Sequence, residues 1–168
     1  MIARRLAGAL LAGALALSAC GGETQPAGKA GESIESIEPA FLPPELLGLR
    51  IAKEDMTEVL TDVDRSYLDG LGLFSMRRGD LLEATLQVSR FGDDARYEDA
   101  DFQARMIQQI GNAKAREAKV GEFVVHLTRG TKQQISVWFD GRFMFVLAVR
   151  DDFEQPRALL RSLLGTKP

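Results

Sequence analysis

The run from residue 143 to residue 149 constrains the fold most strongly, because all seven of its residues are apolar. A half-exposed strand alternates apolar and polar residues, so a strand that is apolar on both faces is expected to be buried on both. We therefore expect residues 142–149 to form a central strand of a sheet, with other elements packed on each side.

Two more strands are expected immediately before it, at residues 122–128 and 134–139. Arg129-Gly130-Thr131 and Asp140-Gly141 separate the three strands, and Asp-Gly is a strong signal for a two-residue hairpin turn. Residues 49–52 fit a short strand, and a second hairpin is expected at residues 73–77 and 81–91. In the latter strand apolar and polar residues alternate, which suits a sheet with one wet or partly covered side.

Three segments carry helical periodicity. Residues 54–64 are expected to form a short helix. Asp99 or Asp101 can cap a second helix, and Pro156 is suited to the first turn of a final one. The apolar residues of these three helices, in order, are Met56, Val59, Leu60 and Val63; Phe102, Met106, Ile110 and Ala113; and Leu159, Leu160, Leu163 and Leu164. Residues 113–120 fit either a helix or a short edge strand.

These elements predict a single α+β domain at residues 41–168. We expect an antiparallel sheet of about five strands packed with two main helices, and a carboxy-terminal helix that follows a three-strand meander. The order of a meander and a final helix resembles the layout of PsbP-like and LpqN-like domains of exported proteins. A fold of this kind does not by itself give a function.

The amino terminus has the three parts of a secretory signal. Residues 1–5 are basic, residues 6–17 consist only of Leu, Ala and Gly, and Ser18 and Ala19 are small. The apolar run is too short for a comfortable transmembrane span, which needs about 20 residues. Residues 21–38 are rich in small and polar residues, contain no aromatic residue and have only Ile34 and Ile37 as large apolar ones. This composition predicts a flexible tether at residues 20–40.

The segment Leu17-Ser18-Ala19-Cys20 resembles the lipobox of bacterial lipoproteins. The resemblance implies that residues 1–19 are a signal peptide cut between Ala19 and Cys20, and that the Cys20 thiol carries a lipid. Two or three acyl chains hold a protein on a bilayer far more firmly than one. Gly21, which is not Asp, favours an outer membrane where the cell has one.

The net charge and composition limit the classes of partner and cofactor that the chain can bind. Removing Arg4 and Arg5 with the signal leaves 19 basic against 24 acidic side chains, a net charge of −5. This balance argues against nucleic acid, whose phosphates require a basic face. The single cysteine excludes an internal disulfide, and the single histidine argues against zinc or haem ligation. We expect no cofactor.

His126 is the one histidine and the strongest candidate for a general base. By alternation it lies on the strand face opposite Val125 and Leu127, and Ser136 is expected near it on the neighbouring strand. The sequence contains no G-x-S-x-G nucleophile elbow. An ordinary sheet residue therefore stays the alternative to a catalytic one.

Trp138 shares a strand face with Gln134 and Ser136, whereas Ile135 and Val137 take the other face. A tryptophan on the less apolar face can pack beneath a helix. The alternative is that it lines a groove for a ligand or partner, where aromatic anchors are favoured.

Other short motifs have simpler explanations. Asp62, Asp64 and Ser66 resemble the start of a calcium loop, which requires a Gly at the sixth position and a Glu at the twelfth and has neither here. Arg78-Gly79-Asp80 spells an adhesion tripeptide and is explained by a hairpin turn. Gly70-Leu71-Gly72 lacks the spacing of a dinucleotide loop and is interpreted as a flexible break.

The sequence therefore predicts a membrane-anchored envelope lipoprotein whose domain binds an envelope protein or a small ligand without catalysis. The alternatives are an envelope hydrolase with His126 as base and a sensor or regulatory domain.

Overall fold

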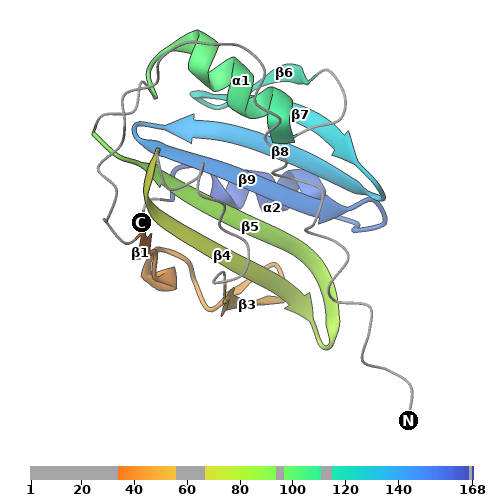
Figure 1. Ribbon diagram of the computed structural model, residues 1–168. Helices are drawn as coiled ribbons and strands as arrows, with labels where there is room; N and C mark the ends of the chain where they lie inside the picture. The colour runs from red at the N-terminus through yellow and green to blue at the C-terminus, as the bar shows by residue number, and fades with distance from the viewer. Residues whose placement is uncertain (1–33, 56–66, 94–96, 111–114, 167) are drawn as a thin grey trace.

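The computed structural model describes residues 34–55, 67–93, 97–110, 115–166 and 168 (Figure 1). These residues form a nine-stranded sheet with two α-helices, which establishes the α+β class. The helices are α1 (Ala100–Ile110) and α2 (Pro156–Leu163), and a short 3-10 turn lies at Pro39–Phe41. The strands are β1 (Glu35–Ser36), β2 (Glu45–Leu46), β3 (Leu49–Glu54), β4 (Leu68–Arg78), β5 (Leu81–Phe91), β6 (Arg116–Val120), β7 (Phe123–Gly130), β8 (Gln133–Asp140) and β9 (Phe143–Arg150).

The strands follow the order β2-β3-β4-β5-β9-β8-β7-β6, and all these neighbours are antiparallel. β1 pairs with β4 in parallel, at Glu35↔Gly70 and Ser36↔Leu71. The expected sheet of about five strands was too small, because β1, β2, β3 and β6 add four strands to it. Residues 49–52, which fit a short strand, lie in β3. β1 and β2 have two residues each, and β6 reads Arg-Glu-Ala-Lys-Val, so none of the three carries the apolar alternation that marks a strand.

β9 lies between β5 and β8 with a helix on each side, which confirms the expectation of a central strand (Figure 1). On one side, called the α2 face, Trp138, Phe145 and Leu147 pack in one buried cluster with Leu159, Leu160 and Leu163 of α2. On the other side, called the α1 face, a second cluster joins α1 to the sheet. Its buried members are Phe91, Phe102, Ile107, Ile135, Val137 and Met144.

Both helices begin where the sequence predicts. The Asp99 carboxylate accepts hydrogen bonds from the backbone N–H groups of Asp101 (2.8 Å) and Phe102 (3.3 Å), as an N-cap does. Pro156 is the first residue of α2. Residues 116–120 take the strand alternative rather than the helical one. The helix expected at residues 54–64 lies outside the described residues from residue 56 onward, and Glu54 itself ends β3.

Gly70 and Gly72 do not break the chain, because both lie inside the 11-residue β4. A Cβ on Gly72 would lie 2.9 Å from the Phe74 ring and 3.1 Å from Ile37 Cβ. A Cβ on Gly70 would lie 3.1 Å from the guanidinium carbon of Arg90. The absence of a Cβ at these two glycines therefore leaves room for the side chains of Phe74, Ile37 and Arg90 to pack against β4.

The fold begins earlier than residue 41, because residues 34–42 pack on the sheet as a segment that we call the N-terminal strap. Ile37 is buried at 6% exposure, and its N–H donates to the Leu71 carbonyl over 2.9 Å. Glu38 forms an ion pair with Lys53 of β3. The last part of the expected tether is thus a component of the folded domain.

Candidate functional site

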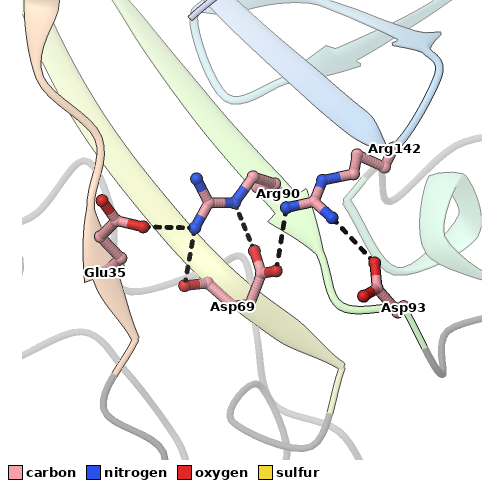
Figure 2. A network of polar contacts seen from close by, with 5 residues as sticks. All are labelled: Glu35, Asp69, Arg90, Asp93 and Arg142. Atoms are coloured by element: carbon pink, nitrogen blue, oxygen red, sulfur yellow. Dashed lines mark hydrogen bonds and ion pairs between the residues drawn. The ribbon is translucent and has the colours of Figure 1, made fainter.

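Five charged side chains form a continuous polar network at one end of the sheet (Figure 2). Asp69 is the second residue of β4, Arg90 lies near the end of β5, and Arg142 lies in the loop between β8 and β9. Glu35 of β1 and Asp93, which follows β5, lie at the two outer positions. The network joins four segments that are far apart in the sequence.

Asp69 holds the centre of the network, because each of its carboxylate oxygens meets a different guanidinium group. Oδ1 accepts from Arg90 Nε at 2.5 Å, and Oδ2 accepts from Arg142 Nη2 at 3.1 Å. Arg90 Nη2 also donates to Glu35 Oε2 at 2.6 Å. Arg142 Nη1 donates to Asp93 Oδ1 at 2.9 Å.

The backbone brings these side chains together. Phe91 N–H donates to the Arg142 carbonyl over 2.8 Å, which fixes the β8–β9 loop beside the end of β5. Gly92 N–H donates to the Tyr67 carbonyl over 2.9 Å, which fixes the start of β4 at the same place. The missing side chain at Gly70 leaves room for the Arg90 guanidinium to lie across β4.

The electrostatics of the network favour charged, paired groups. Hydrogen bonds to Asp69 and then to Glu35 raise the pKa of Arg90 above its ordinary value. Three carboxylates and two guanidinium groups give the network a net charge of −1. Since both arginines already have carboxylate partners, this arrangement is suited to joining segments rather than to binding a further anion.

His126 lies in β7 with a side chain 16% exposed, and its Nδ1 is 3.9 Å from Glu117 Oε1 on β6. Cross-strand pairing sets His126 opposite Val137 and sets Ser136 opposite Leu127. Directly opposed residues share a face, so His126 faces α1 whereas Ser136 faces α2. The expectation that Ser136 lies near His126 was wrong. It was based on the two strands being neighbours, and it did not include the register that decides which face each residue takes.

Trp138 lies in the core on the α2 face at 1% exposure. Its ring stacks on Phe145 with centroids 5.0 Å apart and an interplanar angle of 2°. This placement agrees with the first of the two alternatives, in which the tryptophan packs beneath a helix.

The remaining sequence candidates are placed as follows. Gly79 and Asp80 form the two-residue loop between β4 and β5, with Gly79 at φ +60°, so the hairpin accounts for the tripeptide. Asp62, Asp64 and Ser66 lie outside the described residues, as do Ala19 and Cys20. Within the described ranges no group of three or more His, Cys, Asp or Glu side chains is arranged to hold a metal ion. No helix in those ranges is long and apolar enough to cross a bilayer.

Comparison of the chain with models of protein families, with curated protein sequences and with solved structures found no significant match.

Sequence reasoning missed Asp69, Arg90 and Arg142, because charged residues at strand ends are common and their pairing is set by register. A usable signal was present in Gly70 and Gly72, which interrupt an otherwise strand-like run from residue 68 to residue 78. Glycine inside a strand often marks a close approach of another segment.

Proposed function

We propose that the protein is a bacterial envelope lipoprotein, anchored through a lipid on Cys20, whose domain is a non-catalytic binding or assembly module. The lipobox resemblance of residues 17–20 supports the anchor. An outer membrane is favoured where the cell has one. The proposed partners are the membrane, reached through the lipid, and a protein that pairs with the domain.

The way the chain enters the domain also fits an anchored protein. Because β1 begins at Glu35, the thirteen residues 21–33 separate Cys20 from the strap. A segment of this length spans at most about 50 Å when fully extended. The domain would thus stay close to the bilayer, with its tether starting at the end of the sheet that carries the Asp69 network.

The observation that carries the binding-module proposal is the free edge of β6. β6 ends the strand order and pairs with β7 alone among the described strands. Its loop to β7, Gly121–Glu122, has two residues, so the flanking pair Val120↔Phe123 is hydrogen-bonded and bonded pairs alternate beyond it. The backbone groups of Glu117 and Lys119 therefore point away from β7, ready to pair with an added strand.

Two variants test the two parts of this proposal. Intact-mass analysis of wild-type protein from membranes is expected to show acyl chains on a mature chain that begins at Cys20, and Cys20→Ser is expected to leave the membrane fraction. Lys119→Pro removes an outward N–H without removing a hairpin bond, so it is expected to lose any stoichiometric partner that wild type retains after detergent extraction. A Cys20→Ser protein that partitions into detergent like wild type would refute the anchor. A partner retained by Lys119→Pro would refute the role of the edge.

A further inference from the structure

The outer edge of β6 has a charge order that is complementary to itself. The strand reads Arg116, Glu117, Ala118, Lys119, Val120. When a second identical strand is placed antiparallel with Ala118 opposite Ala118, each Glu117 lies opposite a Lys119 of the other copy. Opposite charges at directly facing positions stabilise strand pairs, and like charges destabilise them.

The backbone agrees with the same register. Glu117 and Lys119 are the residues whose N–H and C=O groups point outward. In an antiparallel pair such residues face each other as hydrogen-bonded pairs. The arrangement thus matches each outward Glu117 with an outward Lys119, and Ala118 forms the non-bonded pair at the centre. A shift by one residue would lose both the hydrogen bonds and the ion pairs.

The side chains leave the edge open. Arg116, Glu117 and Lys119 are exposed, and the Glu117 side chain is 73% exposed. Val124, which lies opposite Lys119 on β7, is an apolar residue with 51% of its surface exposed. In the paired arrangement Val124 would flank the contact from the α1 face.

We propose that this protein self-associates by antiparallel pairing of β6 with β6 of a second copy, which joins two sheets into one across a two-fold axis at Ala118. A pairing of five residues per copy is small for a stable dimer in solution. Anchoring of both copies on one membrane, which rests on the proposed function, raises their effective concentration and favours the pair.

Charged edge strands can also act only to prevent pairing. That role and self-association predict different effects when the charges at positions 117 and 119 are changed. Charges that merely block an edge have no need of a complementary order, and their reversal in pairs would change nothing. Self-association requires opposite signs at positions 117 and 119, whichever sign stands at which position.

Cysteine trapping in membranes tests the arrangement on the full-length protein. Non-bonded antiparallel pairs bring Cα atoms to about 4.5 Å, within the range of a disulfide. Ala118→Cys is therefore expected to form a disulfide-linked species of twice the chain mass under mild oxidation. Ala104→Cys, on the exposed side of α1, is the matched control. The parent chain without an added cysteine reports any linkage through Cys20.

Charge variants in the Ala118→Cys background test the register. Lys119→Glu turns both attractive pairs into repulsive ones and is expected to weaken association about tenfold. Glu117→Lys alone is expected to do the same. Glu117→Lys with Lys119→Glu restores opposite signs and is expected to restore linkage to within about twofold of the unreversed protein.

Three results would overturn the proposal. They are linkage of Ala118→Cys no greater than that of Ala104→Cys, no loss with either single reversal, and no recovery with the double reversal. A disulfide adduct of another mass would show a different partner at the edge and would likewise overturn pairing with a second copy. Membrane fractionation of the same samples reports the anchor separately, so failure of self-association is distinguished from failure of the proposed function.

Discussion

Replacement of Gly72 by alanine tests whether the N-terminal strap is part of the fold. The added Cβ would meet Phe74 at 2.9 Å and Ile37 at 3.1 Å, both closer than normal contact. Phe74 is fully buried in the core cluster on the α2 face, whereas Ile37 directly follows the two-residue strand β1. We therefore expect the strap to move and the core to stay.

The expected cost follows from what the strap would lose. Full burial of an isoleucine side chain contributes about 1.5–3 kcal/mol, and overpacking typically costs about 1–3 kcal/mol. Gly72→Ala is therefore expected to lower the free energy of unfolding by about 2 kcal/mol. With an m-value of about 2 kcal/mol/M, the urea midpoint would fall by about 1 M.

Urea unfolding and amide hydrogen exchange measure the two effects. The Ile37 N–H, which donates to the Leu71 carbonyl in the wild type, is expected to exchange faster in Gly72→Ala. Gly92→Ala is the matched control, because its Cβ would meet the nearest atom at an ordinary 3.8 Å, and we expect a change within about 0.5 kcal/mol. Equal stability of the two variants would refute the packing argument. An unchanged Ile37 exchange rate would refute displacement of the strap.

The remaining predictions concern ion pairs. Asp69→Asn removes the carboxylate shared by Arg90 and Arg142 and is expected to cost about 1 kcal/mol, because these pairs are partly exposed. Asp93→Asn, at a position 94% exposed, is expected to cost much less, and equal costs by urea unfolding would contradict a central role for Asp69. A hydrogen bond from Arg150 lowers the pKa of Asp152 in the folded protein. The pair therefore stabilises the fold fully above the ordinary carboxyl pKa, and this stabilisation is lost as the pH falls through the lowered pKa of Asp152. The stability difference between wild type and Asp152→Asn is therefore expected to shrink below about pH 4, and a difference that grows there would contradict the pairing.

The strongest sequence patterns predicted the central part of the sheet correctly. The apolar run at residues 143–149 occupies the middle of the sheet, and Pro156 starts the final helix as expected. These features are local, because hydrophobic periodicity and turn chemistry act within a few residues. The hairpins were also found, although the β8–β9 loop consists of Gly141 and Arg142 rather than Asp140 and Gly141.

The polar network could not be predicted in the same way. Asp69, Arg90 and Arg142 meet only because β4, β5 and β9 become neighbours in the sheet, and sequence periodicity does not define that register. The same reason explains the wrong expectation for His126 and Ser136, where one residue of register decides the face. β1 was missed because two residues without apolar alternation carry no strand signal of their own.

The strap also sets how the protein would respond to a mechanical load on its membrane attachment. Tension on the tether would reach β1 first, and β1 is held by two residue pairs with β4 and by the ion pair between Glu35 and Arg90. The buried Ile37 side chain and its N–H bond to the Leu71 carbonyl would bear the load next, before any longer strand does. Release of residues 34–42 would add roughly 30 Å of extended chain and leave β3 to β9 paired. The attachment would thus yield in one small step, extending the reach of the domain while its core stays folded.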